Sequence, residues 1–170
     1  MTLGPQNSIA DSPPQPIEVC PEGIPVELKK RPQWINWKYA WNGKKWTKHP
    51  YDPRSDRKAS STDLMTWCTF EEAVAALKTG KYDGVGFVFC SADPFVGVDL
   101  DECRYPETGK IEEWAQKILE RFEDAVHVEV SPSGEGVHLI TRGVRKEGVN
   151  TKRVEVYGQD RYFTITGVAL

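Results

Sequence analysis

The chain has 170 residues, of which 39% are hydrophobic, so it is long enough for one domain with a real core and is not a disordered protein. Its formal net charge of −3 says little about its partners. Its four cysteines form no CxxC pair, which argues against a zinc site or a disulfide framework and favours a reduced, cytoplasmic setting. No apolar run approaches the ~20 residues that a membrane span requires, so we expect no membrane contact.

The first signals along the chain are those of a leader and of helices. Five prolines among polar residues predict that residues 1–24 form a flexible leader, and a short helix is expected over 24–30. Thr69 and Glu72 match a capping box, which predicts the start of a second helix. Apolar residues recur with helical spacing over 111–122, so the apolar stripe of a third helix should lie on a sheet.

Strand signals dominate the rest of the chain. The aromatic run 34–41 and its return over 44–48 flank Asn42-Gly43, a pair typical of a two-residue hairpin turn. Two apolar runs, 84–90 and 95–101, are joined so tightly that they should pair antiparallel. Two further hairpins are predicted, one from residues 127–131 with 137–141 and one from residues 152–157 with 162–166. This order predicts an α+β fold in which a mostly antiparallel sheet carries a helix on one face.

Charge is distributed unevenly along the chain. Residues 29–58 hold ten basic side chains against two acidic ones, whereas residues 61–130 hold fifteen acidic side chains against six basic ones. A basic face beside an acidic centre fits a protein that binds a polyanion while its acids surround metal, and it also fits a solvated mixed surface.

Two aspartates one residue apart end the apolar run 95–101. In a strand, Asp99 and Asp101 point to the same side with their Cα atoms roughly 6 to 7 Å apart. Carboxylates this close repel each other unless a cation lies between them, and Mg²⁺ is usually held by one or two carboxylates together with substrate phosphates. The pair therefore indicates either a divalent metal site or two solvated acids at a strand exit.

A glycine-rich turn follows between the strands of the second hairpin. Gly134 and Gly136 let backbone amides approach an anion, Ser133 offers a hydroxyl, and His138 can donate to a phosphate oxygen. The alternative is a flexible hairpin loop followed by a core histidine.

One acid, Glu155, interrupts the alternating strand near the end of the chain. An inward acid between two valines is costly unless it is paired or bound to metal, although it can also face solvent. Shortly after it, Arg161 offers a phosphate clamp and Thr164 a hydroxyl.

These three motifs, in this order, resemble the archaeo-eukaryotic primase superfamily, and especially the primase-polymerase domains of phage and plasmid replication proteins. They are Val98-Asp99-Leu100-Asp101, Ser133-Gly134-Glu135-Gly136-Val137-His138 and Val154-Glu155-Val156. The resemblance runs from about Pro32 to Gly167, and the combination is highly specific. One departure is Glu135, because some relatives place a lysine inside the Ser-Gly loop.

The resemblance implies a role for each matched residue. Asp99, Asp101 and Glu155 would be the catalytic carboxylates that hold two Mg²⁺ or Mn²⁺ ions. The triphosphate of the incoming nucleotide would be bound by Ser133, Gly134, Gly136 and His138, with help from Lys48, Arg161 and Thr164. In the basic stretch, Lys44, Lys45 and Arg54 are candidates for DNA contact through their charge, with Trp41 or Tyr51 as stacking partners.

The resemblance also implies an architecture and a set of partners. A single domain over 25–170 would combine an RRM-like catalytic sheet, about 84–167, with a smaller N-terminal α/β lobe, about 25–83. Its partners would be single-stranded DNA template and primer, nucleoside triphosphates of either sugar, and a C-terminal helicase or helical priming segment beyond this chain.

The expected function is template-directed nucleotidyl transfer, as a DNA primase, a DNA polymerase or both, in the replication of a phage, plasmid or other mobile element. Two other classes stay open. A non-catalytic single-stranded DNA-binding module would use the same basic lobe, although a polyanion binder gains nothing from clustered acids. A metal-dependent nuclease or nicking enzyme typically needs a pair of metal-binding histidines, and His127 and His138 lie too far apart to form a His-x-His motif.

Overall fold

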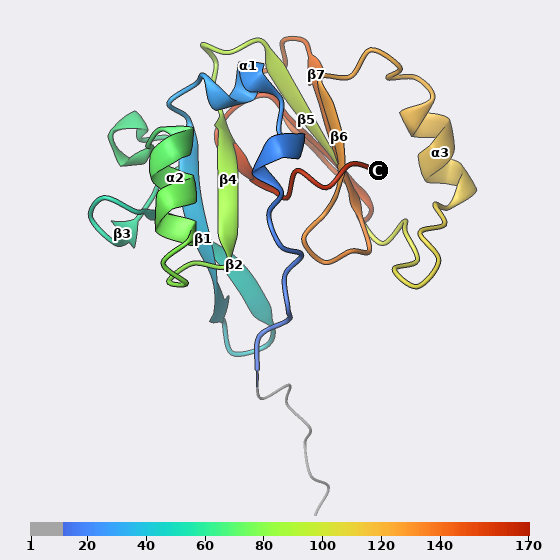
Figure 1. The fold of residues 1–170 in the computed structure, drawn as a ribbon. Coiled ribbons are helices and arrows are strands. Elements are labelled where there is room, and N and C mark those ends of the chain that lie inside the picture. Colours follow the sequence, from blue (N-terminus) through green and yellow to red (C-terminus); the bar gives the residue numbers. More distant parts are fainter. Residues whose placement is uncertain (1–11) are drawn as a thin grey trace, which may run out of the picture.

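The computed structural model describes residues 12–170, which form two five-stranded antiparallel sheets and a few helices (Figure 1). The strand order is β10-β4-β1-β2-β3 in sheet A and β6-β7-β5-β9-β8 in sheet B. The α+β class expected from the sequence is confirmed.

Sheet A contains β1 (Trp34–Trp41), β2 (Trp46–Asp52), β3 (Arg57–Lys58), β4 (Gly84–Phe89) and β10 (Arg161–Ile165). Sheet B contains β5 (Phe95–Leu100), β6 (His127–Val130), β7 (Val137–Arg142), β8 (Val149–Asn150) and β9 (Val154–Tyr157). The helices are α1 (Val26–Lys29), α2 (Phe70–Leu77) and α3 (Glu113–Leu119), with short 3-10 turns η1 (Pro21–Gly23) and η2 (Leu64–Thr66). Within residues 12–170, every helix is too short or too polar to cross a membrane.

The first predicted hairpin is confirmed as β1 paired with β2, with Trp41 opposite Trp46. Its turn differs from the two-residue turn that we expected, because the loop spans residues 42–45. The side-chain oxygen of Asn42 accepts hydrogen bonds from the backbone amides of Lys44 and Lys45, at 3.0 and 2.9 Å, and this local turn makes the loop longer.

The three predicted helices are present, and each covers a sheet face. The capping box is formed, since the Thr69 hydroxyl accepts from the Glu72 amide and the Glu72 carboxylate accepts from the Thr69 amide. Helices α1 and α2 contribute Leu28, Phe70 and Ala73 to a core that also contains aromatic residues of sheet A. Helix α3 lies against sheet B, far from α2 (Figure 1), and its apolar stripe packs on the valines and leucines of β5, β7 and β9.

Two predicted strand pairings are wrong. Strands β4 and β5 were expected to pair, but β4 lies between β1 and β10 in sheet A while β5 lies between β7 and β9 in sheet B. Strands β9 and β10 were expected to form a hairpin, but β9 pairs with β5 and β10 pairs with β4. Residues 84–167 therefore do not form one sheet, because both connections carry the chain from one sheet to the other.

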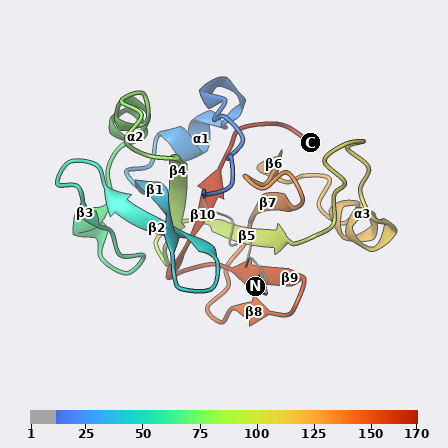
Figure 2. The same cartoon turned by 90° about the horizontal axis from the view of Figure 1, so that it is seen from below.

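Long-range contacts explain these crossings. All six residues of β4 are buried, so this strand needs partners on both edges and packing on both faces. Asp93 fixes the crossing to β5, since its carboxylate accepts from the amides of Cys90 and Phe95, at 2.9 and 2.8 Å. Figure 2 shows the result, with β5 leaving the edge of sheet A toward α3 and β9 lying beside β5.

The expected leader is partly attached to the body of the protein. Residues 1–11 of that prediction lie outside the described residues. The Ile17 amide donates to the Pro132 carbonyl at 3.2 Å, and the Cys20 amide donates to the Thr166 carbonyl at 2.7 Å. Because Ile24 is also buried in the core, residues 17–24 do not behave as the flexible leader that we expected.

Candidate active site

A row of polar side chains crosses sheet B from edge to edge. The strand register places Glu129 of β6 opposite His138 of β7, His138 opposite Asp99 of β5, Asp99 opposite Glu155 of β9, and Glu155 opposite Asn150 of β8. Residues directly opposite in antiparallel strands point to the same face, with Cβ atoms about 5 Å apart. Three of the predicted site residues, His138, Asp99 and Glu155, are therefore adjacent in space, as expected from the sequence.

The two aspartates lie where β5 ends. Asp99 is in the strand, and Asp101 follows directly in the turn that contains Glu102 at φ +48°. The Oδ1 atom of Asp99 is buried without a hydrogen-bond partner, and it lies 3.6 Å from Nε2 of His138. Burial, together with the charges of Asp99 and Glu155, raises the pKa of Asp101 to about 6. This end of the strand therefore concentrates negative charge.

His138 is held between two carboxylates. Its Nδ1 atom lies 3.2 Å from Oε1 of Glu129, its Nε2 atom faces Asp99, and its ring stacks on Phe163 with centroids 4.9 Å apart. Burial by itself would lower the pKa of His138, but the charges of Asp99 and Glu129 outweigh burial and raise it. The imidazole is thus fixed in orientation and favours the protonated form, which can donate to an anion.

Glu129 is a functional candidate that our sequence reasoning missed. Its side chain is fully buried, and it accepts from Nε2 of His127 at 2.8 Å and from the amides of Thr166 and Gly167 at 2.7 to 3.1 Å. Burial would raise the pKa of Glu129, but the hydrogen bonds from His127 and His138 outweigh it and lower the pKa to about 2. The signal was present in the sequence, because His127-Val128-Glu129-Val130 places an acid between valines, just as Val154-Glu155-Val156 does.

Glu155 is held at the other end of the row. Its Oε1 atom accepts from the side-chain amide of Asn150 at 2.8 Å, and its Oε2 atom accepts from the hydroxyl of Tyr157 at 3.0 Å. The Asn150 amide also donates to the Tyr157 hydroxyl at 3.1 Å, so the three side chains form a closed set.

Lys48 approaches the aspartates from sheet A. It lies on β2, and its Nζ atom is 5.7 Å from the centroid of the Trp37 ring. Burial lowers the pKa of Lys48, while the negative charges of Asp99 and Asp101 partly raise it again. Lys48, which was predicted to bind the triphosphate, therefore lies close enough to the two aspartates to interact with their charges, and the site is formed by both sheets.

The predicted phosphate loop is a tight turn that its own side chains fix. The amide of Gly134 donates to the Ser131 carbonyl at 2.8 Å, and the amide of Gly136 donates to Oγ of Ser131 at 3.1 Å. In this conformation the two glycine amides are engaged within the loop. The hydroxyl of Ser133 is also bonded there, since it lies 3.0 Å from Oγ of Ser131 and accepts from the Glu135 amide at 3.3 Å, while Ser133 as a residue is exposed. Gly134 has φ +79°, a conformation that favours glycine.

Two predicted nucleotide ligands lie apart from this loop. Arg161 begins β10 and places its guanidinium 5.1 Å from the centroid of the Tyr157 ring, beside β9. Thr164 is buried in sheet A, opposite Gly86 of β4. Both residues lie on β10, outside this loop, and within residues 12–170 neither forms a hydrogen bond or ion pair with Ser133 or His138.

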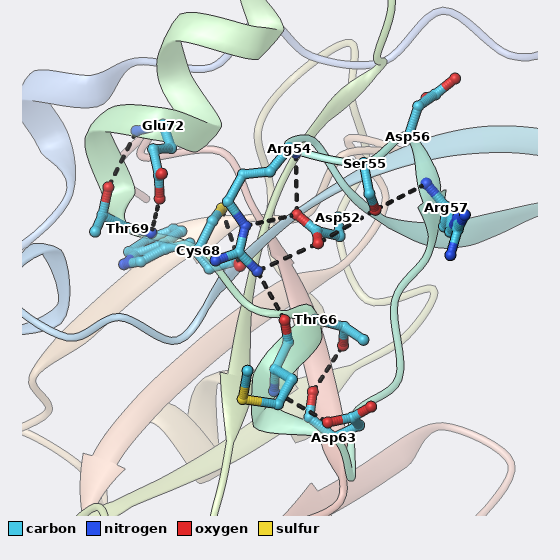
Figure 3. Close-up of polar contacts among 12 residues, drawn as sticks. Asp52, Arg54, Ser55, Asp56, Arg57, Asp63, Thr66, Cys68, Thr69 and Glu72 are labelled. Atoms are coloured by element: carbon cyan, nitrogen blue, oxygen red, sulfur yellow. Dashed lines mark hydrogen bonds and ion pairs between the residues drawn. The ribbon is translucent and has the colours of Figure 1, made fainter.

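The predicted DNA contacts also differ in their surroundings. Lys44 and Lys45 are exposed in the β1–β2 loop, close to the exposed Trp41. Arg54 is instead bound to its neighbour Asp52 (Figure 3). Its guanidinium donates to the Asp52 carboxylate at 2.9 and 3.2 Å and to the Met65 carbonyl at 2.8 Å. These contacts give Arg54 a structural role in the loop after β2.

The carboxylates at the end of β5 have features that suit a divalent metal ion. Within residues 12–170, no three His, Cys, Asp or Glu side chains converge as a ready-made metal site. Two observations nevertheless fit a divalent cation, namely the unpartnered Oδ1 atom of Asp99 and the raised pKa of Asp101, since a cation would relieve both. Glu155 would join these two aspartates by giving up part of its contact with Asn150 and Tyr157.

Comparison with known proteins supports one reading of this site. No protein-family model matches the chain. A curated protein, "DNA Primase-polymerase" of Nitratiruptor phage NrS-1, is 37% identical over 148 residues, a match that covers 82% of this chain. The chain is similar to a phage primase-polymerase. It spans only 20% of the length of that relative, so the similarity supports a primase-polymerase relationship for this part alone.

Proposed function

We propose that this chain is the catalytic part of a phage-type primase-polymerase and performs template-directed nucleotidyl transfer with divalent metal ions. The observation that carries the proposal is the row Glu129, His138, Asp99 and Glu155 across sheet B, with Asp101 at the end of β5. The row puts His138, which favours its protonated form and can donate to a phosphate, next to carboxylates of the kind that bind Mg²⁺ or Mn²⁺. The similarity to a phage primase-polymerase agrees with this chemistry. In this proposal sheet B is the RRM-like catalytic sheet.

Asp99, Asp101 and Glu155 would hold two metal ions. Ions bound in such a site neutralise both the attacking and the leaving oxygen of an in-line displacement at phosphorus. The protein's own contribution is to hold the aspartates at a rigid strand end, where Asp99 lies between paired strands on both sides.

His138, Ser133 and Lys48 would bind the triphosphate of the incoming nucleotide. His138 can donate through Nε2, because Glu129 occupies Nδ1 and two carboxylates favour the imidazolium. Ser133 offers its hydroxyl from the adjacent loop, and Lys48 adds a positive charge from sheet A. These groups neutralise and orient the phosphates, and none of them needs to act as a general base.

Single-stranded template would follow the basic β1–β2 hairpin. Lys44 and Lys45 supply exposed positive charge, and Trp41 is 43% exposed at the end of β1, where a base can stack. Both features lie on the same hairpin as Lys48, so the template would approach the site along β2.

Primer extension on a single-stranded template, with labelled nucleotides and Mg²⁺ or Mn²⁺, tests the proposal. The unaltered chain should make template-directed products, and the double variant Asp99→Ala/Asp101→Ala should reduce them by at least about a factor of a hundred, because two of the three proposed metal ligands are removed. Circular dichroism of the double variant should show an intact fold. Equal synthesis by both proteins would overturn the proposal, and metal-dependent cleavage of the DNA in place of extension would assign the site to a nuclease.

A further inference from the structure

A cavity of about 360 Å³ lies at the β8–β9 edge of sheet B, next to the two side chains that hold Glu155. It is lined by Lys146, Gly148, Asn150, Tyr157, Gln159, Asp160 and Arg161. Asn150 and Tyr157 are the two side chains that hold Glu155. An occupant of the cavity would therefore touch the groups that hold the third predicted carboxylate.

The charges in this cavity favour an anion. Lys146 and Arg161 are exposed, and within residues 12–170 neither forms an ion pair with a carboxylate. Arg161 is steadied by the ring of Tyr157. Asp160 is the acid in the lining, so two cations stand against one carboxylate. Two free cations on a polar wall of this kind are suited to phosphate groups.

The strand order of sheet B indicates which phosphates Lys146 and Arg161 would bind. The Ser133 loop joins β6 to β7, whereas the cavity lies beyond β9, on the other side of Asp99. In an in-line displacement the attacking and the leaving oxygens lie on opposite sides of phosphorus. If Ser133 and His138 bind the triphosphate, the pyrophosphate leaves toward β7, and the attacking hydroxyl must arrive from the β9 side.

We propose that Lys146 and Arg161 bind the backbone phosphates next to the 3′ end of the primer, the strand that carries the attacking hydroxyl. This inference rests on the proposed function. It gives Arg161 a different task from the nucleotide binding that the sequence suggested, because Arg161 lines a cavity beyond β9, whereas the Ser133 loop joins β6 to β7. It also puts the primer end in contact with Asn150 and Tyr157, and so next to Glu155.

A thermodynamic cycle between the protein and the primer backbone tests this inference. Fluorescence anisotropy would measure the binding of the full chain to a primed template whose last two primer linkages are either natural or neutral methylphosphonates. The affinity of the unaltered chain should fall about tenfold on neutralisation, since counterion release at those phosphates is lost. For Lys146→Ala/Arg161→Ala the natural primer should bind about tenfold more weakly, and neutralising the linkages should change little more.

Three comparisons make the test specific. Methylphosphonates in the template strand should weaken both proteins equally. The variant Lys117→Ala/Arg121→Ala, which removes the same charge from α3 and from the turn after it on the opposite face of sheet B, should bind like the unaltered chain. The apparent KM for the incoming nucleotide should stay within twofold in Lys146→Ala/Arg161→Ala.

Each outcome bears on one of the two proposals. Additive losses in the cycle, or a nucleotide KM that rises as much as the primer Kd, would overturn the primer assignment while extension by the unaltered chain keeps the proposed function. If the unaltered chain extends no primer, the proposed function fails and the primer assignment fails with it.

Discussion

Glu129 and His138 show how one buried carboxylate can set the properties of a site residue. Glu129 accepts hydrogen bonds from two histidines and from two backbone amides, so its negative charge is fully compensated in a dry environment. It fixes which nitrogen of His138 faces the aspartates. The same carboxylate joins β6 to the segment after β10, and for this reason it serves both the site and the fold.

Replacing Glu129 with Gln should therefore affect stability and nucleotide binding together. We expect the free energy of unfolding at pH 7 to fall by about 3 kcal/mol, the usual cost of breaking a buried charge network. The apparent nucleotide affinity should fall as well, because His138 loses the partner at Nδ1. Urea denaturation and nucleotide titration would measure the two effects, with Glu123→Gln, an exposed carboxylate, as the control that changes neither.

The loss of unfolding free energy in Glu129→Gln should become smaller as the pH falls. The pKa of Glu129 is lowered to about 2 in the folded protein, below its ordinary value near 4.5. The stability that this carboxylate contributes is therefore present above about pH 4.5 and is lost as the pH falls toward 2. A difference between the two proteins that does not shrink between pH 4.5 and 2 would contradict the assigned role.

At the scale of elements, local signals predicted most of the site and long-range contacts decided the rest. The Asp99/Asp101 pair, the hairpin of β6 and β7 and the capping box of α2 were readable because each depends on residues a few positions apart. The separation of β9 from β10 could not be predicted from the sequence, because Gly158-Gln159-Asp160 is typical of a hairpin turn. What pulls the strands apart is the packing of Phe163 on Phe87 and Phe89 in sheet A, far away in sequence.

The same distinction applies to Glu129 and Arg54. Both Glu129 and Glu155 stand between valines, but only Glu155 was predicted as a site residue. The sequence also does not show that β6 and β7 place Glu129 opposite His138. Arg54 looked available for DNA, but Asp52, two residues earlier, binds it in the folded chain. Charge counts along a sequence do not reveal which cations are already neutralised.

The loop between β6 and β7 gives a prediction at this scale. In Gly136→Ala, the added Cβ would lie 2.8 Å from the Leu100 carbonyl oxygen and 3.0 Å from Oγ of Ser131, so the backbone of the loop must move. We expect the free energy of unfolding to fall by about 2 kcal/mol and nucleotide affinity to fall with it, since Ser133 is displaced. The matched control is Gly143→Ala, whose Cβ would meet only Cγ2 of Val96, at 3.4 Å. Equal stability of the two variants in urea would contradict this account of the loop.

Across the whole molecule, the site depends on how closely the two sheets approach each other. Gly97 lies two residues before Asp99 on the same face of β5, where a Cβ would come within 2.6 Å of ring carbons of both Phe89 and Phe163. Phe163 in turn stacks on His138. Glycine at this position lets sheet A come close enough for its aromatic core to support the histidine in sheet B.

Gly97→Ala should therefore disturb the core and the site through one contact. Overpacking of this kind costs about 2 kcal/mol, and the shift of Phe163 should weaken nucleotide binding by moving the His138 ring. Shortening the opposing side chain should relieve the clash, so that Gly97→Ala/Phe89→Leu unfolds at a higher urea concentration than the sum of the two single losses predicts. Additive losses in that cycle would mean that Gly97 does not set the distance between the sheets. Recovery of both stability and nucleotide affinity in the double variant would show that the approach of the two sheets positions His138.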